Sequence, residues 1–430
     1  MATVLATKPI TRSGALVIGG DYRALGVVRS LGRRGIPVCV LTNEHRVATA
    51  SRYTKKHLWW PRDEGQQVPY LLDLCDRHKL DGWALFPSDD EATALLARNH
   101  SILAARFRMT TPPWESMQWG YDKRLTHQVA AKVGIEQPHT FLPANRGEVA
   151  ALECEFPVVL KPAFKQNMNP FTYAKAWRAD NVQTLLSCYD DACRFVDPSV
   201  IMIQEFIPGD GEQQFSYAAL CADGVPLVSL TARRTRQYPL DFGRASTFVE
   251  SVDLPQIEEP SRRLLKEIGS MGLVELEYKR NVRTGSYQLL DINCRMWGWH
   301  TLGRKAGVDF PYLLWQIIHG EPLPELRARS GVRWVRMLTD LQSAAAEIRR
   351  GRMSLWQYMQ SLRGPLEFAI FSPDDPLPAL LDVPYLASLA WKRKSAGELK
   401  TNSDDRGDTR GRDDSEWAKH RASQDVRNSI

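Results

Sequence analysis

The chain has 430 residues, of which 43% are hydrophobic and 25% are charged. A single hydrophobic core stops growing at about 250 to 300 residues, so this length predicts two or three lobes. The composition is that of a globular protein and excludes fibrous and disordered classes. The net charge of +6 comes from 56 basic and 50 acidic residues spread along the whole sequence, which argues against a nucleic-acid partner.

The seven cysteines form no C-x-x-C pair and no zinc-spaced cluster with histidine. We therefore expect reduced, mostly buried thiols in a cytoplasmic protein. No window approaches the roughly 18 apolar residues that cross a bilayer, and the N-terminus lacks the pattern of a secretion signal. The sequence thus predicts neither secretion nor membrane insertion.

The first part of the chain has the pattern of a βαβ unit. GALVIGG (14–20) predicts a buried strand with a glycine turn, the next segment predicts a helix, and PVCVLT (37–42) predicts a second strand. A helix at about 68–79 and a strand at DGWALFPS continue this α/β lobe. A dinucleotide site, and hence an oxidoreductase, is an alternative, but Gly19, Gly20 and Gly26 do not make G-x-G-x-x-G.

Two apolar strands of the middle segment end in charged residues. FPVVLKPAF (156–164) closes on Lys161, and a helix predicted for 122–133 begins beside Lys123. Each lysine suits a point charge on a nucleotide phosphate, and a solvated surface lysine is the alternative. VIMIQEFIPGDGE (200–212) suits a hinge that reads an adenine edge by main-chain hydrogen bonds, or an ordinary strand end.

A hairpin predicted for 273–295 separates apolar from polar side chains. Alternation puts Val274, Leu276 and Tyr278 on one face and Glu275, Glu277 and Lys279 on the other. On the returning strand, the same rule puts Leu290 and Ile292 on the apolar side, and Asp291, Asn293 and Arg295 on the polar side.

A three-residue loop at Thr284-Gly285 would set Glu277 directly across from Asp291. The Cβ atoms of such a pair lie about 4.5 to 5.5 Å apart, close enough to share a hard cation. Carboxylate and amide oxygens suit Mg²⁺. A solvated hairpin face is the alternative.

Two further segments complete the chain. Arg233, Arg234, Arg236 and then Gly243 and Arg244 make a basic loop that suits a phosphate or a substrate carboxylate, or simply a solvated surface. Residues 322–394 are mostly of helical pattern and predict an appended cap. Residues 395–430 are nearly all polar and predict a disordered tail.

The order of these motifs resembles the ATP-grasp superfamily. The motifs are YDK near 122, FPVVLKPA near 160, QEFIPGDGE near 208, LEYK near 277 and LLDINCR near 291. The chain looks most like carboxylate-amine ligases related to short forms of the carbamoyl phosphate synthetase large subunit and to D-aspartate ligase. The resemblance implies an α/β protein: a Rossmann-like pre-ATP-grasp lobe (1–113), an α+β ATP-grasp fold (114–321, with a lid at about 140–212) and a helical C-terminal cap (322–394).

The resemblance also implies roles for individual residues. Lys123 and Lys161 would touch the phosphates of ATP, Glu205, Phe206 and Ile207 would form the adenine hinge, and Glu212 would take the ribose hydroxyls. Mg²⁺ (or Mn²⁺) would be held by Glu277, Asp291 and Asn293. Arg295 would face the acyl phosphate, and Arg236 would lie in a loop over the substrate.

Three departures from the family pattern stand out. Asp291 occupies a position where glutamate is usual, and Arg280 stands where an acid is common. The lid KQNMNPFTYAKAW (165–177) has no glycine, so we expect Lys175 to substitute for backbone amides at the phosphates.

The activity implied is a ligase that activates a small-molecule carboxylate as an acyl phosphate and couples it to an amine, often an amino acid, with release of ADP and phosphate. The expected partners are these small molecules and no nucleic acid or membrane, and a homodimer is compatible with the resemblance. A carboxylate-thiol ligase and a catalytically inactive ATP-binding regulatory protein remain alternatives.

Overall fold

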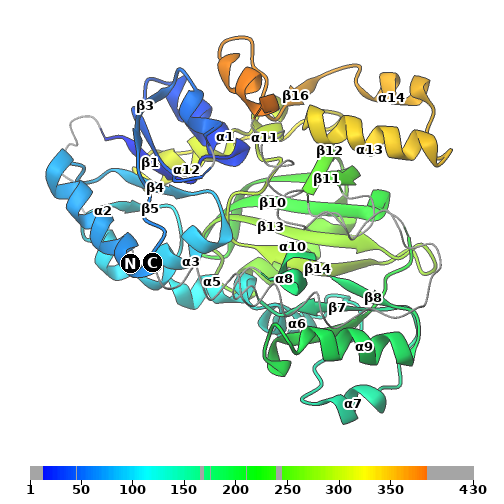
Figure 1. The fold of residues 1–430 in the computed structure, drawn as a ribbon. Coiled ribbons are helices and arrows are strands. Elements are labelled where there is room, and N and C mark those ends of the chain that lie inside the picture. The colour runs from blue at the N-terminus through cyan, green and yellow to red at the C-terminus, as the bar shows by residue number, and fades with distance from the viewer. Residues whose placement is uncertain are drawn as a thin grey trace. The chain divides into compact units, whose positions relative to one another are not determined.

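Three β-sheets organise the residues that the computed structural model describes, which are 13–44, 46–164, 169–174, 176–209, 211–238 and 245–384 (Figure 1). One sheet is parallel and belongs to the N-terminal lobe, and the other two are largely antiparallel. The described residues up to Asp382 form one compact unit. The disordered tail predicted for 395–430 lies outside the described residues.

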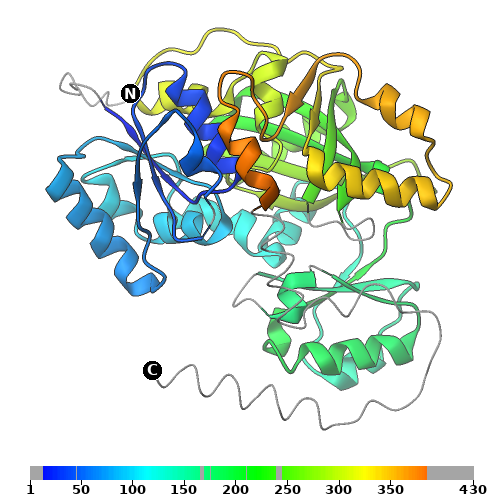
Figure 2. The same cartoon turned by 45° about the horizontal axis from the view of Figure 1, so that its top comes forward.

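The parallel sheet has the architecture that the βαβ pattern predicted. Its strands lie in the order β3 (Thr54–Leu58), β2 (Val38–Leu41), β1 (Ala15–Ile18), β4 (Ala84–Pro87) and β5 (Arg108–Met109). Its helices are α1 (Tyr22–Gly32), η1 (Ala48–Ala50), α2 (Glu64–His78), α3 (Asp90–Arg98) and α4 (His100–Ala104). The connection from β1 to β2 and the connection from β3 to β4 run in opposite directions across the sheet. Right-handed crossovers therefore place α1 and α2 on opposite faces of the sheet (Figure 2). The carboxyl ends of β1 and β4 therefore flank a topological switch point.

The turn from β1 into α1 shows why glycine stands there. Gly19 has a φ of +109°, and a Cβ atom on it would lie 2.0 Å from Ser88 Oγ at the end of β4. Asp21 then begins the helix, because its carboxylate accepts from the backbone N–H groups of Arg23 and Ala24. The absence of a side chain at Gly19 allows the ends of β1 and β4 to approach closely, and Asp21 caps the helix that follows.

The second sheet contains the two strands predicted at 156–164 and 200–212. Its order is β6 (Thr140–Phe141), β9 (Ile201–Glu205), β7 (Val158–Pro162) and β8 (Trp177–Ala179). The helices α7 (Arg146–Ala150), α8 (Pro170–Ala174), α9 (Val182–Ala192) and η2 (Pro198–Val200) belong to this part of the chain. The preceding helices α5 (Trp114–Tyr121) and α6 (Lys123–Lys132) contact β14 (Tyr287–Asn293) of the third sheet. One face of the second sheet packs into an apolar cluster with α7 and α9, as Leu160 and Ile203 show. By alternation, the other face carries Lys161 and Met202, which are paired in register.

The third sheet is the largest. Its order is β14 (Tyr287–Asn293), β13 (Gly272–Arg280), β10 (Gln214–Ala222), β11 (Val225–Tyr238), β12 (Ala245–Val252), β15 (Arg333–Val335) and β16 (Leu366–Phe368). The 3-10 helix η3 (Gly211–Gln213) precedes it, and its helices are α10 (Pro255–Glu267), α11 (Thr301–Ala306), α12 (Phe310–Ile318), α13 (Met337–Arg349) and α14 (Leu355–Ser361). The helix α10 lies against β10 and β11 (Figure 1). It packs with the apolar side of β13, where Val274, Leu276 and Tyr278 are buried.

The two hairpins of this sheet test the turn predictions. The β10–β11 turn lies at Asp223-Gly224 as predicted, with φ values of 48° and 76° that suit a tight hairpin. The predicted three-residue loop between β13 and β14 is wrong, because residues 281–286 connect these strands. A bulge between Glu277 and Tyr278 of the β13 register leaves Leu290 unpaired, so Leu289 takes the buried place expected of Leu290.

The C-terminal segment is helical in α13 and α14, as expected, and it also adds β15 and β16 to the edge of the large sheet. It returns to the first lobe through Arg29 of α1, whose Nε donates to Asp375 Oδ2 at 2.9 Å in a buried ion pair. None of the described helices is both long enough and apolar enough to cross a membrane.

Candidate active site

Four polar side chains on β13 and β14 form what we call the polar row: Glu275, Glu277, Asp291 and Asn293. The strand register pairs Glu277 with Asp291, as predicted, and Glu275 with Asn293. Asn293 Nδ2 donates to Glu277 Oε1 at 2.9 Å and to Glu275 Oε2 at 3.3 Å. Two facing carboxylates and an amide therefore lie together on one face of the sheet, with the amide nitrogen toward the acids.

Small side chains on the neighbouring strands leave room above the polar row. Ser216 of β10 pairs with Glu277, Ala218 pairs with Glu275, and Ala232 of β11 pairs with Ser216. Arg234 lies two residues after Ala232 on β11 and so on the same face, and its Nη2 is 3.5 Å from Glu277 Oε2. The row is thus bordered by small residues and by one cation.

Two lysines from different elements approach the polar row. Lys123, the first residue of α6, donates from Nζ to Asp291 Oδ2 at 2.6 Å. Burial, and then the charge of Lys123, lower the pKa of Lys161 to about 8. In the described ranges no carboxylate forms an ion pair with Lys161. The second lysine is therefore a partly buried cation that an incoming anion would neutralise.

The segment after β9 has the features of a fixed hinge. Lys279 Nζ donates to the carbonyl oxygen of Ile207 at 2.8 Å and lies 4.5 Å from the centre of the Phe206 ring. The Phe206 N–H donates to the Pro157 carbonyl at 3.1 Å. Lys279 and Ile207 are both buried, so the hinge is held from one side by the same strand that carries Glu277.

A buried histidine ties this hinge to α6. His127 Nδ1 donates to Gln137 Oε1, which leaves Nε2 as an acceptor for Gln204 Nε2 at 2.9 Å. Gln204 Nε2 also donates to Thr140 Oγ1 at 2.8 Å. Burial, and then the charge of Lys161, lower the pKa of His127 to about 4, so the ring is neutral at pH 7. The two elements that carry Lys123 and the hinge are thereby joined through neutral groups.

The other end of the polar row meets the switch point of the parallel sheet. Arg295 Nε donates to Asp90 at the start of α3, and Arg295 Nη2 lies 3.3 Å from Asn293 Oδ1. The following loop packs against α1, because a Cβ atom on Gly298 would lie 2.8 Å from the Tyr22 hydroxyl oxygen. Arg336 stacks its guanidinium 4.4 Å from the centre of the Tyr22 ring. Its Nε is buried and has no hydrogen-bond partner among the described residues.

Comparison of the sequence with protein-family models and with curated proteins found no significant match. Solved structures do match the fold. A biotin carboxylase from Campylobacter jejuni, in complex with β,γ-ATP, aligns with a TM-score of 0.60 and 15% identity over 74% of each chain. An L-amino acid ligase from Bacillus licheniformis aligns with a TM-score of 0.57 and 16% identity over 75% of this chain and 79% of that one. The chain has the ATP-grasp fold.

A third matching structure contains an adenine nucleotide and a bicarbonate anion. The biotin carboxylase domain of 2-oxoglutarate carboxylase from Hydrogenobacter thermophilus, in complex with MgADP, ADP and bicarbonate, aligns with a TM-score of 0.61 and 15% identity over 75% of this chain and 74% of that one. Identities at this level establish the architecture alone. The expected fold class, with its Rossmann-like first lobe and α+β core, is confirmed.

Three predicted site residues lie apart from the polar row or outside the description. Arg236 is buried, and its Nε and Nη2 each donate to a carboxylate oxygen of Asp340 at 2.8 Å. This geometry commits the Arg236 guanidinium to the packing of α13, so its contact with a substrate stays a prediction that the geometry disfavours. Glu212 forms an exposed ion pair with Arg233 at 3.3 Å, and its contact with a ribose also stays a prediction. Lys175, like Gly243 and Arg244, lies outside the described residues.

Sequence patterns gave no role to three residues that the structure brings to the candidate site: Glu275, Asp90 and Arg336. Arg234, expected as part of a basic loop for a phosphate or a substrate carboxylate, lies 3.5 Å from Glu277. Alternation along the hairpin did place Glu275 on the polar face, but the sequence did not indicate which residues it contacts. Asp90 contacts Arg295 across 205 positions of sequence, and no local pattern reports such a pair.

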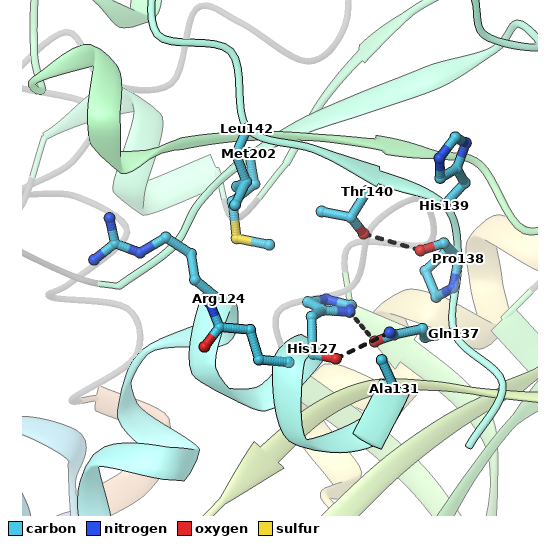
Figure 3. A pocket seen from close by; sticks show the side chains of 10 residues that line it. Arg124, His127, Ala131, Gln137, Pro138, His139, Thr140, Leu142 and Met202 are labelled. Atoms are coloured by element: carbon cyan, nitrogen blue, oxygen red, sulfur yellow. Dashed lines mark hydrogen bonds between the residues drawn. The ribbon is translucent and has the colours of Figure 1, made fainter. Parts of the chain in front are cut away.

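A surface pocket of about 450 Å³ lies beside the site, between α6 and the strands β6 and β9 (Figure 3). Met202 points into it, and the His127 network borders it. The described residues of the polar row do not line this pocket. It is a neighbour of the candidate site and not the site itself.

The polar row suits magnesium as a donor set. Mg²⁺ is usually held by one or two carboxylates together with substrate phosphates. Among the residues that the structure describes, no group of three or more His, Cys, Asp or Glu side chains is arranged to hold a metal alone. The facing carboxylates of Glu277 and Asp291 therefore fit a cation that is shared with a nucleotide.

Proposed function

We propose that this protein is an ATP- and Mg²⁺-dependent ligase that activates a small-molecule carboxylate as an acyl phosphate and couples it to an amine. The observation that carries this proposal is the polar row facing two lysines from separate elements. Glu277 and Asp291 lie opposite each other, Lys123 contacts Asp291, and Lys161 stands nearby without an acidic partner in the described ranges. Such alternation of acids and cations suits a metal-bound polyphosphate better than it suits a neutral ligand.

The solved structures with the same fold support the nucleotide part of the proposal. Two of them are complexes with an adenine nucleotide, and one of these contains MgADP. A third is named an L-amino acid ligase, which agrees with a carboxylate and an amine as substrates. We assign the adenine to the hinge at Glu205, Phe206 and Ile207, and the phosphates to Lys123 and Lys161.

The proposed chemistry has two steps. A substrate carboxylate oxygen attacks the γ-phosphorus, the bond to the β,γ-bridging oxygen breaks, and ADP leaves. The amine nitrogen then attacks the acyl carbon, phosphate leaves, and the amine loses a proton to the released phosphate or to water. When bound, Mg²⁺ would neutralise charge on the phosphoryl oxygens. Lys161 and Lys123 would hold these oxygens in line with the acid.

The substrate carboxylate has a natural place beside Arg295 and Arg336. Both guanidinium groups lie at the junction of the large sheet with the switch point of the first lobe. The unpartnered Nε–H of Arg336 would donate a hydrogen bond to a bound carboxylate, which offsets its buried position.

The test is phosphate release by the full-length protein with ATP and Mg²⁺, screened against carboxylic acids and amino acids with amine acceptors. Product masses identify the bond formed. Glu277→Gln should reduce turnover by about 10² to 10³, as expected when a group that stabilises the transition state is removed. Glu250→Gln is a matched control, because Glu250 is a carboxylate of the same sheet that pairs with Arg333 at 3.3 Å, away from the polar row.

The outcomes separate the candidate functions. Amine-dependent phosphate release that Glu277→Gln abolishes supports the ligase. Thiol-dependent release in its place indicates a carboxylate-thiol ligase. ATP binding without any acid-dependent ADP production indicates a regulatory nucleotide-binding protein, and normal turnover by Glu277→Gln refutes the metal assignment.

A further inference from the structure

Three apolar side chains of the short helix α14 are open to solvent. Leu355, Trp356 and Met359 are 65%, 63% and 51% exposed. With about 3.6 residues per turn, they lie within about 100° of one another around the helix axis and so share one face. Leu341 of the neighbouring helix α13 is 47% exposed. We call these four residues the apolar patch.

The helix α14 is anchored by its cap and by one buried aromatic side chain. The Gln357 N–H donates to Ser354 Oγ at 3.1 Å, and the Ser354 N–H donates to Gln357 Oε1 at 2.7 Å. Tyr358 is buried, and its hydroxyl donates to Met337 Sδ on α13 at 3.7 Å. Leu341 follows Met337 by one helical turn and so lies on the same side of α13. One face of α14 therefore packs on α13, and another carries the apolar patch.

The exposed charges beside the apolar patch have one sign. Residues 341–364 contain one acid, Glu347, and its Oε1 accepts from Arg352 Nη2 at 2.7 Å. The Arg363 guanidinium lies 5.3 Å from the centre of the Trp356 ring. The arginines of this segment are all exposed: Arg349, Arg350, Arg352 and Arg363. Cations and apolar side chains are thus presented together.

We propose that the apolar patch docks on an anionic lipid surface. Helices that bind at a membrane interface combine Trp and Leu with basic residues, because the apolar side chains enter the boundary of the acyl chains while the cations stay at the anionic headgroups. Such docking needs no helix that crosses the bilayer, and it is independent of the proposed ligase chemistry. The sequence patterns did not indicate this partner.

Charge and shape favour a lipid surface over a protein partner. A second copy of the chain that docked through the same patch would bring the arginines of both copies together, and like charges repel. Specific protein partners need surfaces of matching shape. Leu355 and Trp356 instead project from a helix of about two turns that lies at the periphery beside α13 in both views (Figures 1 and 2). A fluid bilayer accommodates such projections without a matching groove.

The experiment is co-sedimentation of the full-length protein with lipid vesicles. One set contains phosphatidylcholine alone, and the other contains phosphatidylcholine and phosphatidylglycerol in a two-to-one ratio. We expect at least about tenfold tighter binding to the anionic set at about 0.1 M salt, because each arginine near such a surface contributes roughly fivefold in affinity. At about 1 M salt this preference should largely disappear, because the Debye length falls to about 3 Å.

Two variants separate the apolar contribution from the electrostatic one. Leu355→Ser/Trp356→Ser should weaken binding to the anionic vesicles by at least about tenfold, because two apolar side chains no longer leave water. Arg349→Gln/Arg363→Gln should weaken the same binding by about 10- to 25-fold and reduce its dependence on salt.

Val225→Ser/Leu227→Ser is the matched control for the apolar variant. These two residues are 54% and 44% exposed at the start of β11. The helix α13 contacts the other end of this strand, where Ser343 Oγ donates to the Gln237 carbonyl at 2.8 Å. The control removes two exposed apolar side chains and leaves the patch intact, so it should bind vesicles like the wild type. Circular dichroism shows that each variant is folded.

A wild-type protein that stays in the supernatant with anionic vesicles overturns the proposed docking. Equal binding by the wild type and by Leu355→Ser/Trp356→Ser also overturns it, because the contact would then lie elsewhere on the chain. A third result against it is a dimer in light scattering that the same variant converts to a monomer without any vesicle binding, which would identify a second copy as the occupant. None of these measurements depends on turnover, so they stand apart from the test of the ligase.

Discussion

Under the proposed function, the ion pair between Lys123 and Asp291 competes with both ligands, because the nucleotide needs Lys123 and the metal needs Asp291. In the structure Lys123 Nζ donates to Asp291 Oδ2 at 2.6 Å. A phosphate of ATP must draw Lys123 away from this carboxylate, and a bound Mg²⁺ would occupy the carboxylate in its place. Asp291→Asn therefore has opposite consequences for ATP alone and for ATP with Mg²⁺.

The size of the first effect follows from the strength of the bond that ATP replaces. A hydrogen bond between charged groups contributes about 1.5 to 3 kcal/mol. A neutral acceptor retains roughly half of this energy. The substitution therefore weakens the bond between Lys123 and residue 291, which ATP must break, by about 0.8 to 1.5 kcal/mol. At about 1.4 kcal/mol per factor of ten, ATP without Mg²⁺ should bind about 4- to 12-fold more tightly to Asp291→Asn than to the wild type.

The second effect has the opposite sign. One of the two carboxylates that we assign to Mg²⁺ is lost, so the gain in ATP affinity on adding Mg²⁺ should fall by about tenfold or more. Isothermal titration calorimetry with ATP, once in EDTA and once with excess Mg²⁺, measures both quantities. Glu250→Gln, which leaves the polar row unchanged, should shift neither.

The exchange of Lys123 and Asp291 between partners is refuted if Asp291→Asn binds ATP in EDTA no more tightly than the wild type and keeps the full gain from Mg²⁺. That result would mean that Lys123 is not shared between Asp291 and the nucleotide. A uniform loss of affinity in both buffers would also count against the exchange, because it would indicate damage to the site as a whole.

Two further predictions concern the charged groups around this site. The pKa of Lys161 is lowered to about 8, whereas phosphates would favour its charged form, so ATP binding takes up a proton above pH 8. ATP affinity in EDTA should therefore fall by at most about tenfold per pH unit between pH 8 and pH 9.5, and Lys161→Arg should flatten this profile because arginine stays charged. An equally steep profile in Lys161→Arg would show that another group titrates. Asp340→Ala leaves the buried Arg236 guanidinium without its partner and should lower the free energy of unfolding in urea by about 3 to 5 kcal/mol. A loss below about 1 kcal/mol, as expected of an exposed pair, would show that Arg236 is free for other contacts.

Local patterns in the sequence predicted the elements and one face of the site. The apolar runs at 14–20 and 37–42 became the buried parallel strands β1 and β2, because strands covered on both faces need continuous apolar residues. Alternation along the hairpin placed Glu277 and Asp291 on one face, and the observed register sets them opposite each other. Both inferences depend on periodicities of a few residues.

Contacts between distant residues were beyond such patterns. Asp340 pairs with Arg236 across 104 positions, so the guanidinium for which a substrate contact was predicted has a buried partner that no local pattern indicated. Trp299 and Ser216 give Glu275 its surroundings, and neither stands next to it in sequence. A residue type suggests which chemistry is available, but the partner decides whether that chemistry faces a ligand or another part of the chain.

The bulge at Leu290 has a consequence for how this hairpin tolerates change in length. Between the bulge and the tip, strands β13 and β14 follow one register, and between the bulge and the polar row they follow another. An insertion or deletion near residues 281–286 would alter only the outer register, since the extra residue at Leu290 can be gained or lost to compensate. The tip of this hairpin can therefore change in length while the facing carboxylates keep their alignment.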